Sequence, residues 1–135
     1  MPRFNRMVVN GAISDRNIFR HSVFVQVKCL QATNTKKYLL LKPHRLPYEE
    51  MYKLIRPVVK AKTVLELATG TGLIAKNIVS SAAHIEATDA SGEMIAQAKR
   101  DSRSAKLHFS LQDMFHLPYA DGSFDVVIVA NALHI

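Results

Sequence analysis

From residue 46 onward, apolar positions recur first at helical spacing and then in short runs that are typical of buried strands. One apolar set predicts a helix that begins at Pro47 and buries a single face: Met51, Leu54, Ile55, Val58 and Val59. Pro57 lies late in this stretch, so a kink or an early end is expected near Arg56.

Four apolar runs predict strands, at residues 63–67, 85–88, 107–109 and 124–130. The last run is nearly continuous, which is typical of a strand buried on both faces of a parallel sheet. Strands alternate with helices through short connections, which implies right-handed crossovers. The pattern therefore predicts an α/β fold with a doubly wound, Rossmann-like parallel sheet.

Two helices are predicted between the first three strands, at residues 73–81 and 92–102. The core contacts expected from the first helix are Ile74, Ile78 and Val79. In the second helix, Ser91 is the predicted N-cap. Its expected inward side chains are Met94, Ile95 and Ala98.

Residues 1–45 carry weaker signals than the rest of the chain. Residues 23–27 form one β-prone piece, and residues 38–41 form a second short apolar run. The pattern leaves open whether this segment is a flexible arm, a small cap or sequence foreign to the domain. We therefore divide the chain into an N-terminal segment, 1–45, and a domain, 46–135.

Composition favours one soluble globular domain. The chain has 135 residues, of which 48% are hydrophobic and 21% charged. No apolar run approaches the roughly 18–20 residues that span a membrane. The single cysteine, Cys29, excludes an internal disulfide and agrees with a reducing compartment. We expect a cytoplasmic protein, with mitochondrial import as the alternative because Asp15 is the only acid in the first 48 residues.

The charge is unevenly distributed along the chain. Residues 1–62 hold 13 lysines and arginines against 3 acids, whereas residues 63–135 hold 5 against 8. A basic half is compatible with binding to nucleic acid. However, the basic residues are scattered, without interleaved aromatic residues or a nucleic-acid motif. We therefore interpret them as surface charges.

Candidate chemistry gathers at the ends of the predicted strands. Glu66, Asp89 and Asp113 lie at or near the ends of the first, second and third strands. In an open α/β sheet, ligands bind outside the carboxyl ends of the strands, where the strand order reverses. Three acids at successive strand ends therefore predict one shared ligand site.

A glycine turn, Gly70 and Gly72, connects the first strand to the following helix. Such a turn lets a ligand lie against the backbone and its N–H groups. Asp89 follows Gly72 by 17 residues, a position from which a carboxylate can accept both hydroxyl hydrogens of a ribose. The charge of Glu66 suits a cationic ligand better than a pyrophosphate.

The stretch Val64-Leu-Glu-Leu-Ala-Thr-Gly-Thr-Gly72 resembles the first motif of class I S-adenosylmethionine-dependent methyltransferases. Asp89-Ala-Ser is similar to the acidic end of that family's second strand. Gln112-Asp113-Met-Phe-His-Leu-Pro118 and Asp121-Gly-Ser-Phe-Asp125 resemble its adenine-side loop and fourth strand. The resemblance covers about residues 47–135 and is nearest to the ubiquinone and menaquinone group.

The resemblance implies S-adenosylmethionine as the cofactor and assigns roles by position. Glu66 would lie near the methionine end. The backbone of the turn would lie beneath the cofactor, at Ala68, Thr69, Gly70 and Gly72. Ala68 stands where the family often has glycine, a departure that we expect to be mild.

The same resemblance implies the roles of the later residues. Asp89, followed by Ala90, would hold the ribose hydroxyls. Asp113 would accept from the adenine amino group, with Met114 packed on the ring. Asn131 would complete the cofactor site. Residues 131–134, from Asn131 to His134, follow the fourth strand, where the family begins to line the pocket of a small methyl acceptor.

The family fold has seven strands in the order 3-2-1-4-5-7-6. This chain ends at Ile135, directly after the fourth strand, so the resemblance predicts strands in the order 3-2-1-4 without strands five to seven. The fourth strand is then expected to be an exposed edge. Residues 1–45 also lack the aromatic-rich helix expected over the cofactor. The chain is therefore expected to be the cofactor-binding half of a methyltransferase.

Two alternatives remain open. A nicotinamide-dinucleotide domain fits formally, since residues 70–75 match G-x-G-x-x-A, but Glu66 would repel the pyrophosphate. The other is a truncated, non-catalytic binding module of the same fold.

If the acceptor must lose a proton, His134 is the candidate base. The other histidines lack metal-like spacing, so no metal site is predicted. The acceptor and the oligomeric state stay open.

Overall fold

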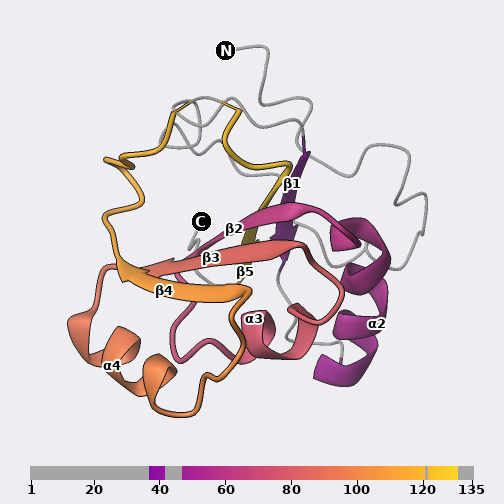
Figure 1. Ribbon diagram of the computed structural model, residues 1–135, viewed down its shortest axis with the longest axis horizontal. Coiled ribbons are helices and arrows are strands. Elements are labelled where there is room, and N and C mark those ends of the chain that lie inside the picture. Colours follow the sequence, from indigo (N-terminus) through magenta and orange to yellow (C-terminus); the bar gives the residue numbers. More distant parts are fainter. Residues whose placement is uncertain (1–36, 42–46, 121, 131–135) are drawn as a thin grey trace.

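The apolar runs form a parallel sheet of five strands (Figure 1). The structure is a computed structural model that describes residues 37–41, 47–120 and 122–130. Its elements in chain order are β1 (Lys37–Leu41), α2 (Tyr48–Val59), β2 (Thr63–Leu67), α3 (Leu73–Ile78), β3 (His84–Asp89), α4 (Gly92–Arg100), β4 (Leu107–Leu111) and β5 (Val126–Ala130). The sheet order is β1-β5-β2-β3-β4.

The four predicted strands are present and are arranged as expected. They correspond to β2, β3, β4 and β5, and their order in the sheet is the predicted 3-2-1-4. All their neighbouring pairs are parallel. The run at residues 23–27 lies outside the described residues.

The expectation that the fourth strand forms an exposed edge is wrong. Strand β1 pairs in parallel with the outer side of β5, with Lys37 opposite Val126 and Leu41 opposite Ala130. This pairing gives the backbone N–H and C=O groups on that side of β5 hydrogen-bonding partners. The short run at residues 38–41 thus belongs to the same sheet as the domain that follows it.

The three described helices lie on one side of the sheet, and residues 112–120 and 122–125 lie on the other side (Figure 1). The chain moves stepwise from β2 to β3 to β4, so α3 and α4 share a face. It then returns past β2 to reach β5. Within the returning segment, Tyr119 packs edge-on against Phe124 with ring centroids 5.0 Å apart.

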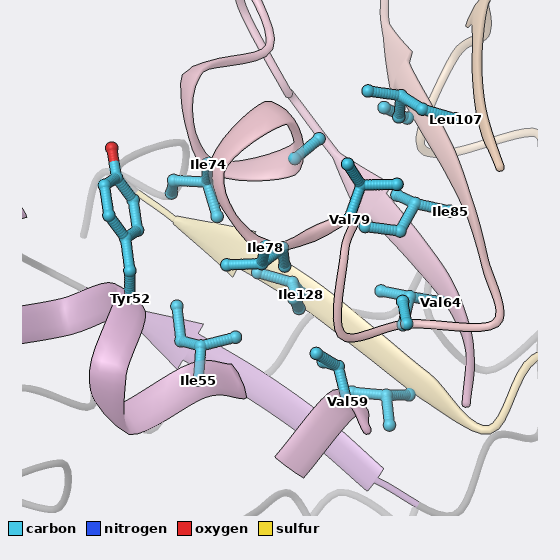
Figure 2. Packing of buried hydrophobic residues seen from close by; sticks show 14 of the residues in the cluster. Tyr52, Ile55, Val59, Val64, Ile74, Ile78, Val79, Ile85, Leu107 and Ile128 are labelled. Atoms are coloured by element: carbon cyan, nitrogen blue, oxygen red, sulfur yellow. The ribbon is translucent and has the colours of Figure 1, made fainter. Parts of the chain in front are cut away.

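The core lies between the sheet and the helices (Figure 2). One row of side chains runs across four strands and is buried: Val126, Val64, Ile85 and Leu107. Helix α2 packs its predicted stripe onto this face, although Leu54 is only partly buried. The predicted contacts from α3 are also buried: Ile74, Ile78 and Val79.

Two helix ends differ from expectation. Helix α2 does not end early but continues through Pro57 to Val59. The carbonyl that Pro57 leaves without an N–H partner belongs to Lys53, which is an exposed residue. Helix α3 ends at Ile78 rather than at residue 81, because Ser81 and Ala82 donate to the carbonyls three residues before them, at 3.0 and 3.2 Å, instead of continuing the helical pattern.

Helix α4 confirms its predicted cap, since the Ser91 hydroxyl accepts from the Met94 N–H at 3.3 Å. Ile95 and Ala98 are buried as expected. Met94 was expected to point inward, but its side chain is 40% exposed. It belongs to the first turn, which begins beyond the carboxyl end of β3 rather than over the sheet, so it has less core to pack against.

Within the part of the chain that the structure describes, no helix combines the length and apolar character that crossing a membrane requires.

Candidate functional site

The carboxyl ends of β2, β3 and β4 bring the predicted acids to one edge of the sheet. Strand β2 stands where the order reverses, with β3 on one side and β5 on the other. In register, Glu66 is opposite Ala87, and Asp89 is opposite Leu111. This is the switch point at which ligands bind in open α/β sheets.

The turn after β2 contains three residues with left-handed backbone angles. Their φ values are +54° at Ala68, +62° at Gly70 and +82° at Gly72. Glycine adopts this region without strain, whereas a Cβ atom costs about 1–2 kcal/mol there. The departure at Ala68, which we expected to be mild, therefore places a strained residue in the turn.

Backbone hydrogen bonds fix the turn against the neighbouring strand. The Thr69 N–H donates to the Thr88 carbonyl at 2.8 Å, and the Gly72 N–H donates to the Thr69 carbonyl at 3.0 Å. Thr88 is buried, and its hydroxyl donates to the Glu66 carbonyl at 3.0 Å. The sequence predicted Thr88 only as the end of a strand, because the hydrophobic pattern does not show that its hydroxyl contacts a carbonyl on β2.

Asp89 joins the turn to the start of α4. Its Oδ2 accepts from the Gly70 N–H at 2.8 Å, and its Oδ1 accepts from the Ser91 N–H at 2.9 Å. The contact with Ser91 fits a role at the start of the next helix. The contact with Gly70 was not foreseen, because it joins residues 19 positions apart. The predicted acid and the predicted glycine turn thus form one unit.

Glu66 lies beneath this unit rather than at its surface. The residue is only 3% exposed, and its Oε1 accepts from the Thr69 hydroxyl. Burial raises the pKa of Glu66 to about 7, against the Thr69 hydrogen bond that lowers it, and the charge of Asp89 raises it further. The carboxyl is therefore about half ionised near neutral pH, and a nearby cation would favour its charged form.

Asp113 is exposed after β4 and is held in a local turn. Its Oδ1 accepts from the Phe115 N–H at 2.8 Å, and its Oδ2 lies 3.1 Å from Nδ1 of His116. These contacts, the Phe115 N–H first, lower the pKa of Asp113. The Gln112 N–H donates to the Asp89 carbonyl at 3.0 Å, which anchors the segment beside β3.

The remaining predicted site residues are partly covered by the structure. Ala90 is exposed directly after Asp89, and Met114 is partly buried after Asp113. Asn131 and His134 lie outside the described residues, so their roles stay predictions. Among residues 37–41, 47–120 and 122–130, no group of three or more His, Cys, Asp or Glu side chains is arranged to hold a metal ion.

The sheet order defines a Rossmann-like α/β domain, with the glycine turn, Glu66 and Asp89 at its switch point. A family profile described as "Methyltransferase domain" matches residues 64–135, more than half of the chain. The chain therefore belongs to this methyltransferase domain family.

Curated relatives and solved structures agree with this assignment. The demethylmenaquinone methyltransferase of Beutenbergia cavernae is 39% identical over 70 residues, which are 52% of this chain and 28% of the relative. That of Thermotoga maritima is 38% identical over 74 residues, 53% of this chain and 31% of the relative. The chain thus spans about a third of the length of these relatives.

Among solved structures, a provisionally assigned S-adenosylmethionine-dependent methyltransferase from Listeria monocytogenes is 26% identical, with a TM-score of 0.56. The match covers 62% of this chain and 40% of that protein. An S-adenosylmethionine-dependent methyltransferase from Mesorhizobium loti has a TM-score of 0.55 over 62% of this chain and 39% of its own. At 22% identity, the second match supports the fold alone.

Proposed function

We propose that residues 46–135 bind S-adenosylmethionine and form the cofactor-binding half of a methyltransferase that acts on a small molecule. The observation that carries this proposal is the hydrogen bond from the Gly70 N–H to Asp89, at 2.8 Å. It joins the glycine turn after β2 to the acid after β3, at the point where strand order reverses.

The hydrogen-bonding capacity of Asp89 fits a ribose. Each carboxylate oxygen offers about two lone-pair sites, and each oxygen accepts one backbone N–H here. One site on each oxygen is left for a ribose hydroxyl. Asp113 accepts one backbone N–H, from Phe115, and its other oxygen lies beside His116, so its carboxylate keeps lone pairs to accept from an adenine amino group, with Met114 next in the chain. The methionine end of the cofactor would then lie over the turn above Glu66.

When bound, S-adenosylmethionine supplies a methyl group that is already activated by its sulfonium. The protein therefore mainly positions the donor and the acceptor and excludes water. The Ala68–Gly72 backbone and Asp89 would orient the donor. In this proposal Asn131 and His134 continue the site toward the acceptor, and His134 serves as the base if the acceptor carries a proton to be removed.

A small-molecule acceptor is favoured by the relatives, whose names describe methyltransferases acting on demethylmenaquinone. We propose no particular acceptor for this chain. We also place the protein in the cytoplasm, because a single cysteine in 135 residues agrees with a reducing compartment.

A calorimetric titration of the chain with S-adenosylhomocysteine, S-adenosylmethionine and NAD tests the proposal. We expect both sulfur nucleosides to bind at least about ten-fold more tightly than NAD, a difference of about 1.4 kcal/mol. Tighter binding of NAD would instead support the dinucleotide alternative. A chain that binds none of the three would contradict the proposed site altogether.

A further inference from the structure

The ring of Phe109 lies against the backbone of Gly72, although the two residues come from different elements. A Cβ atom added to Gly72 would lie 2.6 Å from Cζ and 2.7 Å from Cε1 of Phe109. Both distances are shorter than carbon atoms tolerate without displacement. Gly72 is therefore required by this contact as well as by its φ of +82°.

The ring has little freedom to move away. Phe109 is 3% exposed on β4, in a register row that continues through Ala87 to Glu66. Its neighbour in this row on β3, Ala87, has only a methyl side chain. Nζ of Lys76 also lies over the ring, 5.8 Å from its centroid, and Lys76 is ion-paired with Asp101.

Gly72 in turn fixes the groups that form the candidate site. Its N–H donates to the Thr69 carbonyl at 3.0 Å, and its carbonyl accepts from the Lys76 N–H at 2.9 Å as α3 begins. Thr69 also donates its hydroxyl to Glu66. A shift of Gly72 would therefore move both the turn and the side chain that contacts Glu66.

We propose that Phe109 is a positioning residue of the cofactor site, whose ring holds the Gly72 corner of the turn in its ligand-binding geometry. The inference rests on the proposed function, because it assigns Phe109 an effect on cofactor affinity. Phe109 contacts no ligand in this proposal and acts only through Gly72. Supporting residues of this kind control how precisely a binding site is held.

The first test compares two substitutions on the same face of β4. Phe109→Leu removes the ring atoms that touch Gly72, whereas Leu107→Ala shrinks a buried side chain one row further from the turn. Affinity for S-adenosylhomocysteine is measured by calorimetry and stability by urea unfolding. We expect Phe109→Leu to weaken binding about five-fold and Leu107→Ala by less than about two-fold, even where Leu107→Ala is the less stable variant. Equal affinities in Phe109→Leu and the unchanged chain would overturn the inference.

The second test asks whether a smaller side chain at position 109 restores the binding affinity that a larger residue at position 72 removes. Gly72→Ala should weaken binding, and adding Phe109→Leu should recover about five-fold of the loss by making space for the new methyl group. Gly70→Ala is the matched control, because its φ is also positive but a Cβ there meets nothing within 4 Å. Phe109→Leu should give no recovery in the Gly70→Ala background.

The outcomes separate the two proposals. A double variant that binds no better than Gly72→Ala, or an equal recovery with Gly70→Ala, would overturn the role of Phe109 alone. Absence of binding by the unchanged chain would contradict the proposed function. If Gly72→Ala does not fold, the comparison of Phe109→Leu with Leu107→Ala decides the question.

Discussion

The carboxylate of Asp89 accepts the backbone N–H of Gly70 at 2.8 Å, which joins the acid after β3 to the turn after β2. The other oxygen of the same carboxylate accepts from Ser91 at 2.9 Å, where α4 begins. Asp89 thus holds three elements together before any ligand arrives. A substitution there should affect both the shape of the turn and the ligand contacts.

Asp89→Ala should weaken binding of S-adenosylhomocysteine by about 1.5–3 kcal/mol, because charge-assisted hydrogen bonds to the ribose are lost. Asp89→Asn should weaken it less, since one acceptor oxygen remains. Glu49→Ala, which removes an exposed acid of α2, is the charge-matched control. Calorimetry measures the affinities, and circular dichroism shows that each variant is folded. Unchanged affinity in a folded Asp89→Ala chain would reject the ribose role.

The buried Glu66 should make the stability of the fold depend on pH. Its pKa rises from 4.5 to about 7 on folding, chiefly through burial. Between these values the folded chain holds a proton that the unfolded chain has released, so stability falls as the pH rises. The loss amounts to about 3 kcal/mol and levels off about one pH unit above the folded pKa of about 7.

Glu66→Gln should remove this dependence, because the amide does not titrate. The free energy of unfolding is measured in urea between about pH 5 and about pH 8 for both proteins. The quantity compared is the difference between the unchanged chain and the variant at each pH. Glu93→Gln, at an exposed position in the first turn of α4, should leave the profile unaltered. A difference between the unchanged chain and Glu66→Gln that stays constant with pH would show that Glu66 remains ionised in the fold.

The same carboxyl should couple ligand binding to proton release. A positively charged group of the cofactor near Glu66 favours the ionised carboxylate and lowers its pKa. Binding near pH 6.5 should therefore release protons, with fewer than about one released per ligand bound. This number is measured by calorimetric titration in two buffers that differ in ionisation enthalpy. Glu66→Gln should release none and should also bind more weakly. Equal proton release by both proteins would assign the effect to another group.

The positions of the strands could be predicted because each is a short apolar run with a clear boundary. The run at 63–67 matches β2 residue for residue, and the switch-point acids follow from where such strands end. The pairing of β1 with β5 could not be predicted. It joins residues about 90 positions apart, and a four-residue apolar run carries no information about its neighbour.

Asp89 and the glycine turn were identified from the sequence as parts of one candidate site, but the contacts between them were not predicted. Asp89 and Gly70 were both identified, yet their hydrogen bond depends on how β3 places its end against the turn. Phe109 was predicted only as a strand residue, because its contact with Gly72 crosses from β4 to the turn after β2. Met94 was misplaced because helical periodicity does not show where the core ends.

The positive φ of Ala68 predicts that glycine at this position stabilises the fold. Relief of the steric strain is worth about 1–2 kcal/mol, and the added freedom of glycine in the unfolded chain removes about 0.5–1 kcal/mol of that gain. Ala68→Gly should therefore raise the free energy of unfolding by roughly 0.5–1 kcal/mol. Ala61, with φ of +57° in the turn before β2, should respond in the same way although it lies outside the site.

Ala96→Gly is the control, because this substitution should lower the free energy of unfolding rather than raise it. Ala96 is exposed within α4, where glycine costs about 1 kcal/mol relative to alanine. Urea unfolding of the three variants should give two increases and one decrease in stability. Because the turn already has its left-handed geometry, Ala68→Gly should also leave the affinity for S-adenosylhomocysteine within about two-fold of the unchanged chain. A loss of stability in Ala68→Gly comparable to that in Ala96→Gly would show that the turn is unstrained at Ala68.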